Sequence, residues 1–427
     1  MRNRFISMLA ATMLLALTAI PSAEEAFVIG GENGWQLSTD GIVDVFSVYQ
    51  TASPLPAGPR FPSFLNGNPT YDQEFGVRVG LLPSVVAFNV KAPTVNGVDS
   101  AVRVGIYPNI QNNNKTVFDS TGKGVGGLRF DTSPNIDFRE IYYTAGGAYG
   151  QLLAGRALNL YQGRNILTDM TLLTAGVVGA PGGGTTLGHI GYGYLYTNFG
   201  PQIRYTTPDL NGVKVALSVN EPYKISGDTA KTPTPRIETE ISYATVLNGG
   251  TTLQAWASGL YQSATRKDGV PRPGEQNHSI GGAAGTEVGL GNVSLLASGY
   301  AGEGLGMISA QDGDFGAAGI SSTDGAGEER THFGFLAQAT YKLTPTIKLG
   351  ANYGQSRQAE SDYDKSQRGV GGAFSPMKKQ EAAVGMVTYN LNKFTQFIAE
   401  YTYAQNTWHD GATQHSNSVA LGTMFYW

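Results

Sequence analysis

The residue types used in enzyme catalysis occur in this 427-residue sequence, but not at spacings that would let them act together. The chain has no cysteine, which excludes a thiolate nucleophile and cysteine-ligated zinc or iron–sulfur centres. Its histidines form no His-Glu-x-x-His pair, and no nucleophile-elbow serine or suitably spaced carboxylate accompanies them. They are His189, His278, His332, His409 and His415. We therefore expect no catalytic residues and no enzyme activity.

Two acidic pairs and one glycine run resemble fragments of ligand-binding motifs. The Asp-Gly-Asp at 312–314 and the Asp-Tyr-Asp at 362–364 contain calcium-binding residue types, but neither continues into a full set of oxygen ligands. The glycine-rich run at 179–184 lacks the Lys-Ser or Lys-Thr that follows in a phosphate-binding loop. The sequence thus predicts no cofactor-binding residues and no metal site.

The charged residues with most potential for function are four arginines that interrupt apolar stretches. Arg78, Arg103 and Arg204 each lie between two apolar residues, and Arg139 is out of phase with the apolar residues around it. Because successive side chains of a β-strand point to opposite faces, we expect all four guanidinium groups on the polar face of a sheet. The elements that position them must therefore be strands with one apolar and one polar face.

Apolar and polar residues alternate with a period of two along most of the chain. At 347–354, isoleucine, leucine, alanine and tyrosine alternate with lysine, glycine and asparagine, and similar patterns occupy 333–342 and 213–219. After residue 23 no apolar run is long enough for a transmembrane helix, which needs about 20 residues. The fold is therefore predicted to be all-β, with one face of each strand in an apolar environment and the other in water.

The connections between the predicted strands alternate between short and long. Seven short turns and eight long loops join sixteen strands. An even number of strands, with short turns at one end and long loops at the other, predicts a transmembrane antiparallel β-barrel. The predicted strands are 34–49, 74–91, 98–110, 127–145, 149–157, 199–208, 213–220, 236–247, 251–266, 278–288, 293–306, 330–342, 346–358, 378–389, 394–409 and 415–427.

Aromatic residues favour this barrel over the alternative, a secreted β-sandwich with tyrosines in its core. Many of the 22 tyrosines fall near predicted strand ends, where interfacial girdles lie in membrane barrels. The last predicted strand alternates outward apolar residues up to the terminal tryptophan. Both features are typical of a wall that contacts lipid.

The regular alternation is broken in two places. In the strand 74–91 the apolar face changes from odd to even residue numbers across Pro83, as one extra, bulged residue would require. Glu140 shares the apparent outward parity of Phe138 and Tyr142. A carboxylate facing lipid would cost ~2 kcal/mol or more near the midplane. We therefore expect Glu140 at a protein interface, although an irregular strand would also explain its phase.

The first 23 residues have the features of an export signal. Arg2 and Arg4 precede an apolar run, 5–20, and small residues follow at 22 and 23. We expect residues 1–23 to be removed and residues 24–427 to form a single barrel domain. The formal net charge of −4 gives no reason to expect a nucleic-acid partner.

Short segments spread over the chain carry a family resemblance. They are Asp-Gly-Ile-Val-Asp at 40–44, Arg-Glu-Ile-Tyr at 139–142, Gly-Arg at 155–156, Thr-Asp-Met at 168–170, Gln-Ile-Arg-Tyr-Thr-Thr-Pro at 202–208 and Phe-Tyr-Trp at 425–427. In this order and spacing, from about residue 34 to the C-terminus, the chain resembles the general bacterial porins. These are the sixteen-stranded trimeric diffusion channels of Gram-negative outer membranes.

The resemblance implies that the third long loop, 157–198, folds into the lumen as a constriction. It places wall arginines opposite this loop, which matches Arg78, Arg139 and Arg204, and Arg103 adds a fourth inward-facing cation. The acidic residue of the loop is Asp169.

In one respect the loop departs from the family. Porins of this type commonly continue Asp-Met with Pro-Glu-Phe-Gly-Gly, whereas Met170 is followed here by Thr-Leu-Leu-Thr, so a second acidic residue is missing. Asp44, Asp137 and Glu238 also lie where they could face the lumen and partly cancel the arginines. We therefore expect only a weak preference for anions.

The resemblance also implies partners. A homotrimer would use the outward Glu140 together with Arg156, whose side chain could reach an acid of a neighbouring subunit. In this family an aromatic C-terminus is recognised during insertion of the barrel, and Phe425 and Trp427 match that signal. The expected partners are thus two further copies of the chain, outer-membrane lipid and the barrel assembly machinery, after export through the periplasm.

The predicted function is passive diffusion of ions and small hydrophilic solutes through a water-filled channel in the outer membrane. One alternative is a channel specific for a sugar or an organic anion, which should show a track of aromatic residues along its lumen. Trp256 and Tyr300 face inward by parity but form no such track. The other alternative is a structural or adhesive surface barrel, which would need a filled lumen or repetitive extended loops.

Overall fold

The computed structural model describes residues 27–58, 60, 61, 63–65, 73–110, 136–179, 185–231, 234–310, 321–370 and 375–427. The predicted signal peptide at 1–23, the Asp-Gly-Asp at 312–314 and the start of the fourth predicted strand lie outside the described residues. A search of the described part of the chain finds no helix with the length and apolar character needed to cross a bilayer.

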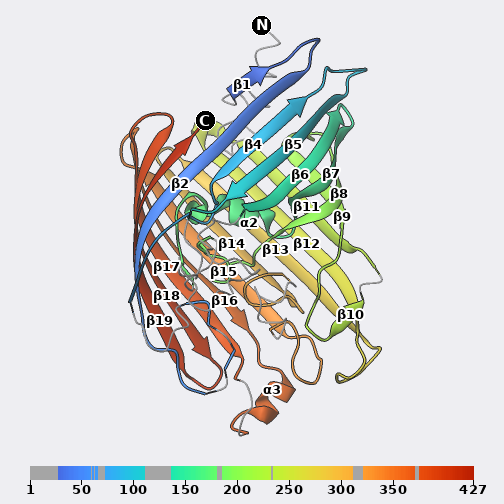
Figure 1. Ribbon diagram of the computed structural model, residues 1–427, viewed down its shortest axis with the longest axis vertical. Coiled ribbons are helices and arrows are strands. Elements are labelled where there is room, and N and C mark those ends of the chain that lie inside the picture. The colour runs from blue at the N-terminus through green and yellow to red at the C-terminus, as the bar shows by residue number, and fades with distance from the viewer. Residues whose placement is uncertain are drawn as a thin grey trace, which may run out of the picture.

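Sixteen antiparallel strands form the wall of the protein (Figure 1). They are β2 (Gln36–Ala52), β3 (Gln73–Arg78) with β4 (Val85–Lys91), β5 (Asp99–Pro108), β6 (Ile136–Gly147), β7 (Gly150–Leu158), β8 (Phe199–Thr206), β9 (Val213–Asn220), β11 (Arg236–Val246), β12 (Thr252–Arg266), β13 (Gln276–Leu290), β14 (Val293–Glu303), β15 (Thr331–Lys342), β16 (Ile347–Gln358), β17 (Met377–Asn390), β18 (Thr395–Trp408) and β19 (Thr413–Tyr426). Each pairs with its neighbours in chain order, and β19 pairs with β2, which closes the barrel.

Smaller elements decorate this wall. The pieces β3 and β4 both pair with β2 and together count as one barrel strand. The short strands β1 (Phe27–Gly30) and β10 (Thr229–Lys231) add to β2 and β12. The helix α3 (Asp362–Gln367) lies in a long loop. The predicted fold class, a closed antiparallel barrel of sixteen strands, is confirmed.

The two ends of the barrel differ. Short turns and the C-terminus lie at the upper end in Figure 1, and long loops, including the one that carries α3, lie at the lower end. We call them the short-turn end and the long-loop end. Asn96, Gly97, Asn211 and Gly212 adopt positive φ in the short turns, which explains the Asn-Gly pairs there.

The two faces of the wall differ as the alternation predicts. On β19, for example, Val419, Leu421 and Phe425 are exposed on the outside, whereas Ala420 and Met424 are buried inside. The same division repeats on the other strands, because a strand places successive side chains on opposite faces. The outer face is therefore an apolar surface suited to hydrocarbon.

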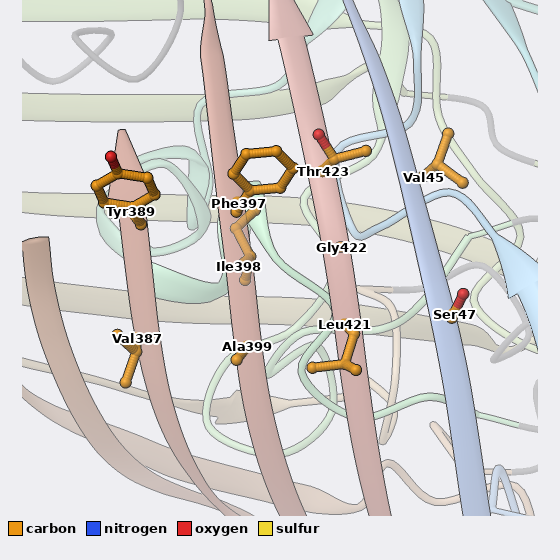
Figure 2. A pocket seen from close by; sticks show the side chains of 10 residues that line it. All are labelled: Val45, Ser47, Val387, Tyr389, Phe397, Ile398, Ala399, Leu421, Gly422 and Thr423. Carbon is orange, nitrogen blue, oxygen red and sulfur yellow. The ribbon is translucent and has the colours of Figure 1, made fainter. Parts of the chain in front are cut away.

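A shallow groove interrupts this outer face where β17, β18, β19 and β2 meet (Figure 2). The groove is present because Ser47, Ala399 and Gly422 have small side chains or none, whereas the larger Tyr389 and Phe397 also line it. The residues that line it are Val45, Ser47, Val387, Tyr389, Phe397, Ile398, Ala399, Leu421, Gly422 and Thr423. The groove lies outside the barrel and is not part of the passage through it.

The second barrel strand is interrupted between β3 and β4. Residues 79–84 stand opposite only three residues of β2. Asp44 of β2 holds this interruption in place, since its carboxylate accepts hydrogen bonds from the amide of Gly80 (2.5 Å) and the hydroxyl of Ser84 (2.8 Å). Three extra residues reverse the faces of the strand in the same way as a single extra residue, because both numbers are odd. The predicted change of face is therefore correct, and the predicted single-residue bulge is wrong.

A one-residue bulge in β6 decides where Glu140 points. Between the pairs that join β5 to Glu140 and to Asp137, β6 has one residue more than β5. The bulge reverses the faces, so that Phe138 before it and Ile141 after it are both exposed on the outside. Glu140 therefore faces inward. The outward position predicted from its parity is wrong, and the irregular strand is the correct explanation.

The C-terminal residue completes the closure of the barrel. Trp427 exchanges two backbone hydrogen bonds with Gly41 (3.1 and 3.2 Å), and its ring lies beside that of Phe425 (centroids 6.3 Å apart). Deleting Trp427 removes these contacts at the seam between β19 and β2. We expect a lower yield of folded protein, measured by refolding into detergent, with an unchanged conductance of the molecules that fold.

The exposed Trp35, at the same end of the barrel, offers a matched control. The variant W35A should fold with the yield of the wild type. A normal yield from the chain that lacks Trp427 would contradict this role of the terminal residue.

Candidate functional site in the barrel interior

Residues 159–198, between β7 and β8, form the longest connection of the barrel, and we call them the inner segment. They include the helix α2 (Gly163–Thr168) and the 3₁₀ turn η2 (Met170–Leu173). Apolar residues of the segment form one buried cluster with inner-face residues of β12, β14, β15, β17 and β18. The cluster contains Ile166, Leu172, Val177, Ile190, Tyr192 and Tyr194 of the segment and Trp256, Leu296, Leu336, Ala382 and Ala404 of the wall.

Polar wall residues hold the backbone of the inner segment. Glu238 accepts hydrogen bonds from the amides of Leu160 (2.7 Å) and Tyr161 (3.0 Å), and Glu400 accepts one from the amide of Gly176 (2.6 Å). Three more wall side chains do the same: Ser258 for Gln162, Gln338 for Met170 and Ser356 for Gly193. Because buried amides need partners, these side chains fix the course of the segment.

Asp169 belongs to this set of anchors. Its side chain is only 3% exposed and accepts hydrogen bonds from the hydroxyl of Tyr194 (2.7 Å), the side-chain amide of Asn352 (3.2 Å) and the backbone amide of Thr171 (2.9 Å). Burial, together with the adjacent carboxylate, raises the pKa of Tyr194 well above its usual value, so its phenol keeps the proton that it donates. Asp169 therefore ties the segment to β16. The prediction that it faces the arginines across an open passage is wrong.

Arg78 is also used as an anchor. It is 4% exposed, donates from Nη1 to the carbonyl oxygen of Val178 (3.1 Å) and forms an ion pair with Glu74 (3.8 Å). A guanidinium group held in this way is closed off from the lumen. Arg78 therefore lies beside the inner segment, but it stabilises the segment rather than presenting a charge to solutes.

The inner segment also completes the interrupted wall. The backbone amide of Leu81 donates to the carbonyl of Thr174 (3.0 Å), and that of Leu82 donates to the carbonyl of Leu172 (3.1 Å). Both amides lie between β3 and β4, where the ladder to β2 is missing. The segment thus supplies the acceptors that the neighbouring strand does not.

Arg103 is the centre of an inward-facing ion network near the short-turn end. Its guanidinium donates to the carboxylates of Asp40 (2.8 and 3.0 Å) and Glu140 (2.9 Å) and to the side chain of Asn89 (3.1 Å). The hydroxyl of Tyr107 donates to the same oxygen of Glu140. Glu140 is thus satisfied within its own chain, and its predicted role at a trimer interface is wrong. Two carboxylates also outweigh the single charge of Arg103.

The other arginines have separate surroundings. Arg204 is half-buried on the face opposite to the exposed Ile203 and Tyr205. Arg139 lies at the bulge of β6, where it donates to Asp137 (2.8 Å) and stacks over aromatic rings. Among the described residues, no hydrogen bond or ion pair joins Arg139 to the inner segment, so the structure does not bring it to the predicted constriction.

Arg156 points away from the interior. It pairs across the ladder with Pro201 of β8, and both have the outward parity of the exposed Ile203. Its Nη1 donates to the carbonyl of Phe199 in the same chain (2.6 Å). The position is compatible with a contact to another subunit.

The comparisons with known proteins agree with this geometry. A family model described as Gram-negative porin matches residues 10–409. The chain belongs to the Gram-negative porin family. This porin is therefore an outer-membrane channel and not an enzyme. The described residues hold no group of three or more histidines, aspartates and glutamates that could bind a metal ion.

Solved structures of other outer-membrane proteins share its fold. The outer membrane channel DcaP of Acinetobacter baumannii has a TM-score of 0.67 and 15% identity, covering 94% of this porin and 100% of that chain. An anion-selective porin from Comamonas acidovorans has a TM-score of 0.60 and 12% identity, with 92% and 100% covered. OprB of Pseudomonas putida has a TM-score of 0.53 and 11% identity, with 91% and 94% covered. A search of curated protein sequences finds no match.

The anchor at Asp169 can be tested by the variant D169A. The change leaves the Tyr194 hydroxyl and the Asn352 amide without their acceptor, and each unpaired buried donor costs about 1–3 kcal/mol. We expect the inner segment to open more often, which should increase cleavage by an added protease and enlarge current fluctuations in single channels.

The variant D137A provides the control, because the side chain of Asp137 is 55% exposed and lies outside the inner segment. It should match the wild type in both measurements. Equal protease resistance and equal current noise in D169A and the wild type would overturn the anchoring role.

Proposed function

We propose that this porin forms a water-filled channel for passive diffusion of ions and small hydrophilic solutes. The observation that carries the proposal is the partial exposure of ionised groups inside a closed barrel, on its inner face and on the inner segment. The side chains of Arg103 and Arg164 are 18% and 29% exposed, and Arg204, Lys214 and Lys348 are also half-buried. Ionised groups in a dry interior would cost tens of kcal/mol, so this many inner charges require water.

A narrowing by the inner segment is part of the proposal. Its apolar cluster fills the space against β12 to β18, and the anchors described above keep it there. Trp256 and Tyr300, the inward aromatics that a sugar-specific channel would use, are buried rather than open to solutes. This favours passive diffusion over a specific aromatic track.

A weak preference for anions follows from the inner charges that remain open. Arg103 is outweighed by two carboxylates, and Arg164 is paired with Glu240 (2.9 Å). Arg204 and Lys214 form no ion pair within the described residues. In a confined lumen such charges act more strongly than the net charge of the exposed loops, because low-dielectric walls focus their field.

The channel can be tested by shortening the inner segment. The amide of Val177 donates to the carbonyl of Gly188 (2.9 Å), so the two ends of the stretch 179–187 lie close together, and deleting it should remove chain volume while the anchors on either side are kept. In planar bilayers we expect a larger conductance from the deletion variant and, for the wild type in a KCl gradient, a reversal potential shifted modestly toward chloride. An unchanged conductance would contradict the constriction, and strong potassium selectivity would contradict the anion preference.

We also propose that the channel is a homotrimer surrounded by outer-membrane lipid and inserted by the barrel assembly machinery, which would read Phe425 and Trp427. The outward Arg156 supports a protein contact on β7. An arginine facing hydrocarbon at the midplane would cost about 2–4 kcal/mol, so a neighbouring subunit is the better environment.

Native mass measurement in mild detergent tests the trimer. We expect a trimer of the wild type and a smaller trimeric fraction of R156E, because the reversed charge would no longer meet an acid of the neighbour. The exposed loop residue Arg368 supplies the control, and R368E should remain trimeric. Monomers alone from the wild type would refute the trimer.

A further inference from the structure

Two lysines face each other across the inner wall at the short-turn end. Lys342, the last residue of β15, is directly opposite Lys348 of β16 in the antiparallel ladder. Both share the face of Gln338 and Asn352, the residues that bond to the inner segment. Opposed residues in such a ladder have Cβ atoms about 4.5–5.5 Å apart, and like charges there repel. The pair is therefore a concentrated positive charge on the lumen side.

No carboxylate within the described residues forms an ion pair with either lysine, and Glu287 of β13 only partly compensates the two charges by attracting Lys348 from a greater distance. Neither ammonium group takes part in an ion pair or a side-chain hydrogen bond there. The oxygens of Glu287 accept hydrogen bonds from Ser294 (2.5 Å) and Gln254, so this carboxylate is held on β13 instead of contacting a lysine, and its single charge is smaller than that of the pair. The lysine pair thus differs from Arg103 and Arg164, whose charges are matched by carboxylates at 2.8–2.9 Å.

The pair lies just beyond the inner segment on the way through the barrel. Gly350, which separates Lys348 from Asn352 on the inner face, leaves no room for a side chain, because an added Cβ would lie 2.7 Å from the sulfur of Met170. The lysines lie four positions along the strands from the Gln338–Asn352 pair, which is about 13 Å along the wall. The lysines therefore stand at the exit of the space that the inner segment occupies.

The position around the barrel sets the pair apart from the arginines. Counted round the closed sheet, β15 is the eighth barrel strand from β6 and so lies on the opposite wall. The wall at β5 and β6 carries the ion network of Arg103, in which acids exceed bases. The mouth at the short-turn end thus has a negative cluster on one side and, on the other, a positive pair that is only partly compensated by Glu287.

We propose that Lys342 and Lys348 are the main determinants of anion preference in this channel. Small anions that pass the inner segment are concentrated beside the two ammonium groups, and cations are driven toward the opposite wall. The proposal rests on the proposed function, a water-filled passage. It assigns most of the selectivity to this lysine pair, a smaller part to Arg204 and Lys214, and none to Arg78 and Arg139.

The test compares the double variant K342Q/K348Q with the wild type in planar bilayers, by the reversal potential in a KCl gradient. We expect the chloride-to-potassium permeability ratio to fall about threefold, as two charges at ~8–10 Å predict, and the effect to fade in concentrated salt. The variant K342R/K348R keeps both charges and should retain the wild-type ratio. The control K393Q removes a lysine from a turn at the same end, where it lies over the ring of Phe394.

The outcomes separate this inference from the proposed function. An anion-preferring wild type with an unchanged K342Q/K348Q ratio would overturn the role of the lysines and leave the channel function standing. A wild type without anion preference would contradict that part of the proposed function, whereas a shift toward cations in the double variant would still support the lysines. A lower chloride-to-potassium permeability ratio in K342R/K348R would refute the assignment to this pair. So would a fall in K393Q as large as that in K342Q/K348Q.

Discussion

Pairing of the backbone is the constraint on which the rest of this structure depends. Inside a membrane no water bonds to exposed N–H and C=O groups, so each strand needs a partner on both edges. The chain meets this demand by joining β19 to β2 over the length from Ser416 to Tyr426. Once the sheet is closed, alternate side chains must point into the barrel. The polar interior is thus a consequence of the closed ladder.

The same constraint applies a second time inside the barrel. A loop that lies against the inner wall brings amides that also need partners, and Glu238, Gln338 and Glu400 supply them. The inner polar residues therefore divide into two groups. Some hold the segment through hydrogen bonds and are buried, as Asp169 is, and the others keep contact with water, as Lys348 does. Only the second group can act on a passing ion.

Much of the barrel could be predicted from the sequence, because a period of two and Asn-Gly turns are local signals. The predicted strand limits agree with the observed ones to within a few residues where the structure describes them. Such local signals do not reveal how many residues are inserted at an interruption, however. One or three extra residues before β4 reverse the faces equally, so the change at Pro83 could be read but its size could not. At Glu140 the half-buried Tyr142 was indistinguishable from an outward aromatic.

The roles of the inner charges were less accessible for a different reason. Asp169 finds its partners 25 and 183 residues away, at Tyr194 and Asn352. An aspartate that is bonded on three sides and one that is open to solutes look alike in a single sequence. Parity therefore gives the face on which a side chain lies, whereas long-range packing decides whether its charge remains available.

The two hydrogen bonds from Leu81 and Leu82 to the inner segment limit how modular this porin is. A surface loop can be exchanged without affecting the wall, because its own backbone is solvated. Here part of the loop serves as a neighbour to residues 79–84, so the wall is not fully paired until Leu172 and Thr174 are in place. Wall and loop are thus expected to fold as one cooperative unit. A loop transplanted from another porin would need the matching strand interruption to travel with it.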